Sequence, residues 1–185
     1  MRQSDWSSQM DGSENDNGIE GPRLYEARTL PRWDDLPDFG LYMDQVISLM
    51  ERYLGPPVGP GERGLTASMV NNYVKMGVVP SPQKKKYGRS HLACLVVVCA
   101  LKAVLPLEII RQILSARLAQ NTLEEAYDEF CTNFEAAERS AAELVDSLDM
   151  ASEPQKAIVV SALNARAQRN VALAYFLRVQ SDDPL

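Results

Sequence analysis

The sequence has 185 residues, of which 45% are hydrophobic, and its 19 basic and 25 acidic side chains give a formal net charge of −6. This length suits one ordinary domain with a tail, and the longest apolar run, 92–101, is far shorter than the roughly 20 residues that span a membrane. The charge is unevenly distributed. Residues 63–118 hold nine basic side chains and one acidic side chain, whereas 1–62 and 119–185 each hold five basic and twelve acidic ones. The net charge therefore does not exclude nucleic acid, because phosphate binding needs only a local positive surface.

The N-terminal residues 1–37 are predicted to form a disordered acidic tail. Large apolar side chains are few among the Ser, Asp, Asn, Gly and Glu of residues 1–22, so the segment cannot bury enough surface to offset the entropy of ordering it. The apolar stretch of a secretory signal is missing, which predicts a cytoplasmic protein with three free thiols. The cysteines do not have metal-ligand spacing, and we expect no metal and no cofactor.

Two helices are predicted between residues 38 and 77. The first runs from about 38 to 53, since its apolar side chains recur at helical spacing, and it ends at a Gly/Pro-rich segment, 55–61. For the second helix, Thr66 supplies an N-cap and Gly77 a C-terminal stop. One face of this second helix presents a polar stripe at i, i+3, i+4, i+7 spacing, made of Ser68, Asn71, Asn72 and Lys75.

A basic turn and a buried helix follow. Pro80 and Pro82 bias the chain toward an extended path, and residues 84–89 then form a short basic turn or hairpin, a small wing. The next helix, His91 to about Val104 with Ser90 as its cap, is apolar nearly all round, which is typical of the centre of a core. Another helix extends from 107 to about 118, and residues 38–118 are predicted to form one domain.

The C-terminal part, 119–182, is predicted to be helical throughout. Thr122 and Glu125 form a capping box, and the apolar residues from Leu123 to Leu148 repeat in steps of four and three, as in a coiled-coil seam. The seam fits a dimerising coiled coil, and it also fits a hairpin with a last helix that begins near 152. The short connection at 150–152 favours the hairpin, with a homodimer through its remaining face. The fold class is all-α.

The polar stripe and the basic turn are the candidate functional residues. Asn side chains bond adenine edges, Lys reaches guanine or phosphate, and a recognition helix places such groups on one face. The same residues also fit an ordinary solvated surface. The hydroxyl of Tyr87 could bond a phosphate, although packing between helix and wing suits this residue better. The predicted DNA-contacting residues are Ser68, Asn71, Asn72, Lys75, Lys84, Lys85, Lys86, Tyr87, Arg89 and Lys102.

Catalysis is not expected. The sequence has no G-x-S-x-G, P-loop or H-E-x-x-H motif, and its single histidine, His91, has no candidate nucleophile or paired base beside it. We interpret His91 as a structural or phosphate hydrogen-bonding group, and the chain as a protein that is not an enzyme.

Two resemblances sharpen this interpretation. Residues 69–80, MVNNYVKMGVVP, resemble the T-L-R-Y-Y-E-x-x-G-L-I-x-P signature of the MerR family of bacterial regulators at Tyr73, Gly77 and Pro80. Residues 38–130 more closely resemble an uncharacterised bacterial group, domain-of-unknown-function family 1836, in the segments LYMDQV, NNYVK and KKYGRSHL. The resemblance implies a MerR-like winged helix-turn-helix followed by a helical hairpin.

Two functional hypotheses follow. The first is a bacterial transcriptional regulator that binds double-stranded DNA. The second is a protein-interaction module on a degenerate winged helix, whose basic face receives an acidic partner or the chain's own acidic tail. The second is motivated by Asn71, which stands where the MerR signature has Arg, and by the two acidic flanks of the basic block, each with a charge of −7. Val74 in place of Glu, and the Gly/Pro-rich segment 55–64 in place of a tight turn, are further departures from the MerR pattern.

Overall fold

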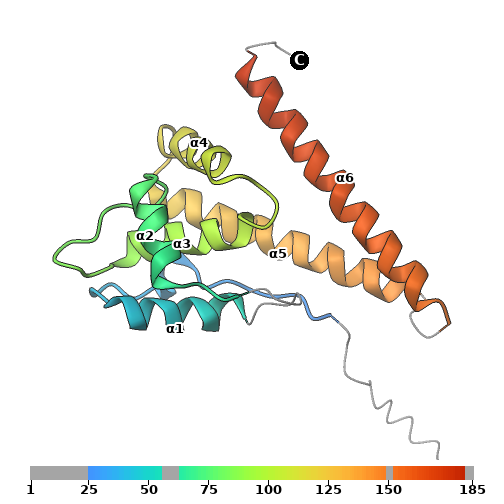
Figure 1. Ribbon diagram of the computed structural model, residues 1–185, viewed down its shortest axis with the longest axis horizontal. Coiled ribbons are helices and arrows are strands. Elements are labelled where there is room, and N and C mark those ends of the chain that lie inside the picture. The colour runs from blue at the N-terminus through green and yellow to red at the C-terminus, as the bar shows by residue number, and fades with distance from the viewer. Residues whose placement is uncertain (1–24, 56–62, 149–151, 182–185) are drawn as a thin grey trace, which may run out of the picture.

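The computed structural model describes residues 25–55, 63–148 and 152–181, and in these residues the fold is helical (Figure 1). Pairing of β type is limited there to two isolated bridges, Leu41 with Tyr87 and Gln83 with Lys86. The all-α prediction is therefore confirmed. The elements are the 3-10 helix η1 (Trp33–Asp35) and the helices α1 (Met43–Leu54), α2 (Ala67–Lys75), α3 (Arg89–Leu101), α4 (Leu107–Leu118), α5 (Leu123–Ser147) and α6 (Pro154–Gln180).

Local capping signals define several helix ends as predicted. The hydroxyl of Thr66 accepts a hydrogen bond from the Met69 amide at 3.3 Å, and Gly77 has the positive φ of 70° that ends a helix. The side chains of Thr122 and Glu125 complete the capping box at the start of α5. The predicted cap of α3 was wrong, because the helix begins at Arg89 and Ser90 lies inside it.

Helix α3 is the centre of the core, as its composition predicts. All eight residues from His91 to Val98 are buried. Because α1, α2, α4 and α5 each place at least one buried side chain into the same core cluster, α3 is covered on several sides. A helix that is apolar all round requires such an arrangement.

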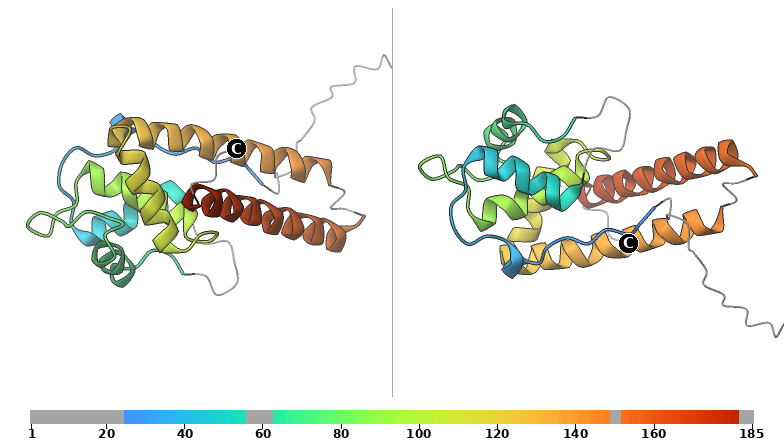
Figure 2. Two further views of the ribbon diagram at one scale, coloured as in Figure 1. Left: turned by 90° about the horizontal axis from the view of Figure 1, so that it is seen from above. Right: turned by 90° about the horizontal axis from the view of Figure 1, so that it is seen from below.

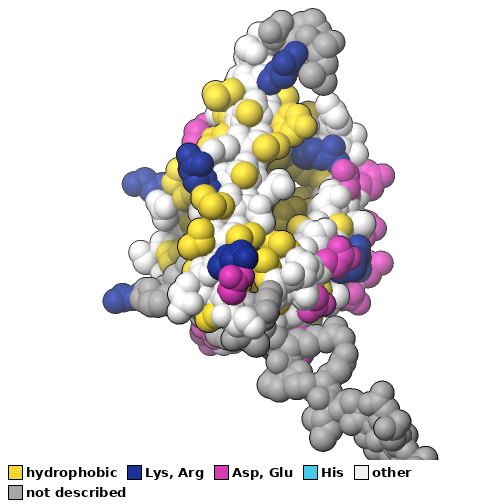
Figure 3. All heavy atoms as spheres, turned by 90° about the vertical axis from the view of Figure 1, so that its right-hand side faces the viewer, with side chains coloured by type: hydrophobic (Ala, Val, Ile, Leu, Met, Phe, Trp, Pro, Cys, Tyr) yellow, Lys and Arg dark blue, Asp and Glu magenta, His cyan; other side chains and the backbone are white. Residues whose placement is uncertain are grey.

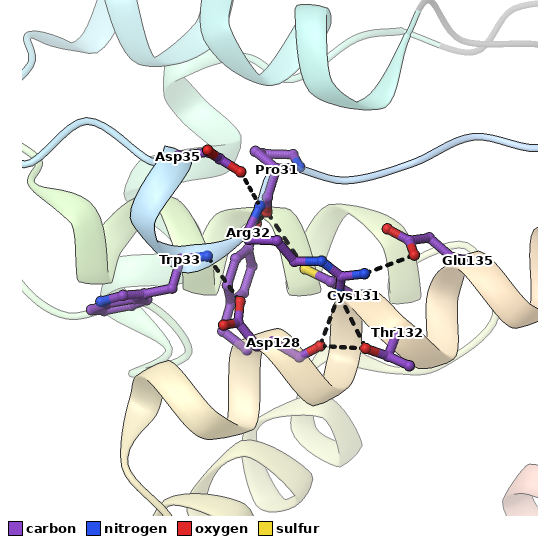
Figure 4. Close-up of polar contacts among 9 residues, drawn as sticks. Pro31, Arg32, Trp33, Asp35, Asp128, Cys131, Thr132 and Glu135 are labelled. Carbon is purple, nitrogen blue, oxygen red and sulfur yellow. Dashed lines mark hydrogen bonds and ion pairs between the residues drawn. The ribbon is translucent and has the colours of Figure 1, made fainter.

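The predicted boundary at residue 37 is wrong, because residues 25–37 are folded against α5 (Figure 4). Leu30 and Leu36 are buried in the core. The backbone N–H of Trp33 donates to the Asp128 carboxylate at 2.8 Å, and the Tyr127 hydroxyl donates to the Pro31 carbonyl at 2.9 Å. These contacts cannot be inferred from composition, since they join residues about 95 positions apart. The rest of the predicted tail, 1–24, lies outside the described residues.

Helices α5 and α6 form the predicted antiparallel hairpin, but the hairpin is open. The first half of α5 packs on the domain, its second half projects away from it, and α6 returns toward α4 at a distance from α5 (Figures 1 and 2). Along α6 only Ala157 is buried. Near its C-terminal half, α6 is joined to the domain by a hydrogen bond from Arg169 Nε to the Val104 carbonyl at 3.0 Å and by the amides of Gln180 and Gln112 at 2.9 Å.

Candidate nucleic-acid interface

Helix α2 presents the predicted polar stripe to solvent. Val70 and Tyr73, on its other face, are buried in the core and fix the rotation of the helix. All four residues of the stripe are exposed: Ser68, Asn71, Asn72 and Lys75. The Nδ2 of Asn72 lies 3.6 Å from the sulfur of Met76, which is a weak contact, so its amide is not committed to a strong intramolecular partner in the described structure.

The basic turn is a two-residue β-hairpin. The backbone groups of Gln83 and Lys86 pair through hydrogen bonds of 2.9 and 3.1 Å, and Lys84 and Lys85 form the turn between them. Both turn residues have positive φ, 49° for Lys84 and 63° for Lys85. Positive φ at both central positions is typical of type I′ turns, where Asn and Gly are the favoured residues. Two exposed lysines thus occupy a turn that suits smaller residues better.

Lys86 is held by the segment before α1. Its ammonium lies 5.4 Å from the centre of the Tyr42 ring, a cation–π geometry. Its aliphatic stem lies so close to Gly40 that an added Cβ there would come within 2.9 Å of the Lys86 Cβ. Tyr42, which is 54% exposed, was not predicted to belong to this surface. Its place in the LYMDQV segment was a signal that could have indicated it.

Tyr87 does not belong to the candidate interface, which corrects the prediction. Its side chain is 3% exposed, and its backbone exchanges two hydrogen bonds with Leu41, of 2.8 and 2.9 Å. Its ring meets the imidazole of His91 edge-on, with ring centres 5.6 Å apart. Burial raises the pKa of the Tyr87 hydroxyl above its ordinary value, so the group remains neutral at physiological pH. Tyr87 therefore joins the hairpin to the core.

His91 positions the base of the hairpin. Its Nδ1 accepts the Gly88 N–H at 3.0 Å, so its Nε2 is the nitrogen that donates to the Ser81 carbonyl, 3.2 Å away. The imidazole thus bridges the chain entering the hairpin and the chain leaving it. His91 was expected to be either a structural group or a phosphate hydrogen-bonding group. These two hydrogen bonds give it a structural role.

The other two predicted cations are placed differently from the hairpin lysines. Arg89 points back to the N-terminal segment, where its Nε donates to the Leu36 carbonyl at 3.1 Å and its Nη1 meets Asp34 at 3.3 Å. Lys102 caps the opposite end of α3, roughly 20 Å from Arg89 at the α-helical rise per residue. Helix α2 and the hairpin therefore lie toward the same end of the molecule (Figure 1), whereas Lys102 lies at the end of α3 that is far from Arg89.

In the segments that the structure covers, no group of three His, Cys, Asp or Glu side chains could hold a metal ion. Within the same segments, no helix is long and apolar enough to cross a membrane.

These features define a helical domain with a polar surface helix beside a basic hairpin. The model of the family described as domain of unknown function (DUF1836) matches residues 31–130, and the chain belongs to this family. The match begins upstream of residue 38 and so includes residues 31–37 of the segment that packs on α5. No curated protein and no solved structure matches the chain.

Proposed function

We propose that the protein is a bacterial DNA-binding transcriptional regulator with a MerR-like winged helix-turn-helix. The observation that supports this best is that α2 and the lysine hairpin both lie at the end of the molecule remote from the α5–α6 turn (Figures 1 and 2). The order α1, α2, hairpin, α3 is also the order of a winged helix-turn-helix.

The dimensions of α2 suit the major groove. Its nine residues make a helix roughly 13 Å long, comparable with the groove width of about 12 Å. In the proposed complex, Asn71 and Asn72 bond base edges, and Lys75 bonds guanine or phosphate. Lys84 and Lys85 contact phosphates of the flanking backbone, which fixes the orientation of α2 in the groove.

The conformation of the hairpin also supports a role for its charge. A residue other than Gly, Asn or Asp pays about 1–2 kcal/mol to adopt the left-handed region. Lys84 and Lys85 both adopt positive φ, although neither side chain forms a hydrogen bond or ion pair with the residues that the structure describes. In the proposed complex, contacts between these two lysine side chains and DNA phosphates offset the cost of the left-handed conformation.

The C-terminal hairpin suits dimerisation. Seven large apolar side chains of α6 are about half exposed or more: Ile158, Val159, Leu163, Val171, Tyr175, Leu177 and Val179. They lie on several sides of the helix, and hydrophobic side chains gather along α6 and around the hollow beside it (Figure 3). A helix with this distribution needs cover on more than one side. A four-helix bundle formed by two hairpins supplies it, because each helix then touches two others.

Charge complementarity supports the same assembly. Helix α5 holds eight acidic side chains and one basic one, whereas α6 holds four basic side chains and no acidic one. Two α6 helices brought together alone would repel each other. We therefore propose a homodimer in which the α6 of each protomer lies against the α5 of its partner, with two DNA-binding surfaces per dimer.

The test is binding to duplex DNA at 50 and 200 mM salt. Neutralising about four phosphates makes affinity fall roughly a hundredfold over this range. Reversing all three hairpin lysines (Lys84→Glu, Lys85→Glu, Lys86→Glu) is expected to abolish binding. For a matched control, Lys85→Glu is compared with Arg139→Glu, which reverses one exposed charge on α5. Binding that is insensitive to salt, or equal in these two single variants, would contradict the proposal.

A second candidate function rests on Asn71, which stands where the related signature has a phosphate-binding Arg. On this alternative the basic surface binds an acidic protein segment, and residues 1–24, with five acidic and two basic side chains, are a candidate within the same chain. Deleting residues 1–24 tests whether this segment shields the basic surface from DNA. Self-shielding predicts tighter DNA binding by the shortened chain, whereas unchanged affinity excludes shielding.

A further inference from the structure

A cavity lies between α3, α4 and α5, on a side of the core that the candidate DNA interface does not use. Its volume is about 160 Å³. Helix α3 contributes Cys94 and Val97, and α4 contributes Ile113 and Leu114, while α5 contributes Phe130. The cavity is open to solvent at its rim and is lined by three helices, so it is a pocket that a small molecule can enter.

The walls of the cavity are apolar. Most of the lining side chains are aliphatic or aromatic, and Leu101, Leu123 and Phe130 are only half-buried because they face this space. The polar groups of the wall either have a hydrogen-bond partner within the protein or carry no charge. The Tyr127 hydroxyl donates to the Pro31 carbonyl, and burial raises the pKa of the Cys94 thiol to about 11. The interior therefore offers no charge to a ligand.

The rim of the cavity is polar but electrically balanced. Arg117 from α4 and Glu129 from α5 form an ion pair with each other, and both side chains are about half exposed. Asn133, one turn further along α5, is exposed as well. Since Glu129 neutralises Arg117, the rim offers hydrogen bonds without a net charge that would attract an anion.

We propose that this cavity is a binding site for a small neutral hydrophobic molecule of about the size of a single aromatic ring. An apolar cavity of about 150 Å³ is large enough to hold benzene. The ligand fills the space between α3, α4 and α5 and places at most one uncharged polar group at the Arg117–Glu129 rim. Binding at this site is independent of whether the protein binds DNA.

Toluene is a suitable probe, followed by NMR of the Ile, Leu and Val methyl groups of the full chain. The methyl signals of Val97, Leu101 and Ile113 are expected to shift in a saturable way. Those of Val46 and Val70, which are buried elsewhere in the core, are expected to remain in place. Absence of shifts at saturating toluene, or equal shifts at both sets, would overturn the proposal without any variant being needed.

Two variants on the same helix then locate the site. Ala126→Leu adds a side chain inside the cavity and is expected to weaken toluene binding at least tenfold. Ala137→Leu makes the same change at an exposed position and is expected to leave the affinity unchanged. The unshifted Val46 and Val70 signals report that each variant is folded. Equal affinities of the two variants would show that toluene binds elsewhere.

The charge of the ligand is tested with benzoate, which has the same ring and a carboxylate. Benzoate is expected to bind at least tenfold more weakly than toluene, because Glu129 competes for Arg117 and the walls are apolar. Tighter binding of benzoate would overturn the assignment of a neutral ligand.

Discussion

The guanidinium of Arg32 and the carboxylate of Glu135 form an ion pair at 2.8 Å, which fastens the N-terminal segment to the middle of α5 (Figure 4). The same guanidinium donates to the Asp128 carbonyl and to the Thr132 hydroxyl, both at 3.1 Å. One side chain thus bonds three successive groups along one face of α5. The segment it holds also buries Leu30 and Leu36, so this contact stabilises the core.

Replacing Arg32 is therefore expected to destabilise the fold. Arg32→Ala removes hydrogen bonds from a charged donor and leaves Glu135, which is only 16% exposed, without this partner, a loss of about 2–3 kcal/mol. Denaturant unfolding measures it, and Arg139→Ala, at an exposed position of α5, is expected to change stability by less than about 0.5 kcal/mol. Equal effects of the two variants would show that the ion pair contributes little.

The lysine hairpin is expected to show a trade-off between stability and DNA binding. Changing Lys84 to Asn and Lys85 to Gly gives the turn the residues that positive φ favours, and should raise the free energy of unfolding by about 1 kcal/mol. The same change removes two phosphate-binding charges, so DNA affinity should fall and its dependence on salt should become shallower. Unfolding and DNA titrations on the same double variant test both. A variant that is more stable and binds DNA equally well would show that these lysines are not used.

The proposed dimer depends on the apolar surface of α6. Val171→Glu together with Tyr175→Glu places two charges on that surface and is expected to convert dimer to monomer in light scattering after size-exclusion chromatography. As a control, Gln168→Glu together with Asn164→Glu introduces the same charge at exposed polar positions of the same helix. A wild-type protein that is monomeric at all concentrations would instead indicate that α6 closes on its own α5.

The thiols of Cys94, which is buried, and Cys99, which is partly buried, predict a loss of stability at alkaline pH. Burial raises the pKa of both Cys94 and Cys99 from the ordinary value of 9.0 to about 11. The folded protein thus keeps these protons between pH 9 and 11, where the unfolded chain releases them. This contribution to stability is fully present below pH 9 and is lost as pH rises toward 11.

Unfolding curves between pH 7 and 11 measure this effect. Cys94→Val, which cannot ionise, is expected to reduce the alkaline slope, while Ser115→Val on the exposed side of α4 should leave it unchanged. The thiols should also react slowly with a thiol reagent at pH 8 in the folded protein and rapidly in denaturant, because only the thiolate reacts. Rapid labelling of Cys94 in the folded state would contradict its assigned burial.

The sequence alone determined the elements whose causes are local. Periodicity and capping residues located the helices, because a helix depends on side chains three and four positions apart. The Thr66 cap, the Gly77 stop and the Thr122–Glu125 box were all identified in this way. The apolar composition of α3 similarly predicted the centre of the core.

Only the tertiary structure decided what depends on distant partners. The segment 25–37 looks polar and tail-like in sequence, yet it folds because Asp128, Glu135 and Glu138 present hydrogen-bond acceptors to it from α5. For Tyr87 the residue pattern allowed both packing and a phosphate contact, and the fold decides for packing, because Leu41 and His91 enclose it. The initial acidic total was likewise uninformative, because charge acts over short distances in salt solution and the fold determines which charges are neighbours. The cavity and the open hairpin depend on how helices distant in the sequence pack together, and local sequence patterns do not predict such packing.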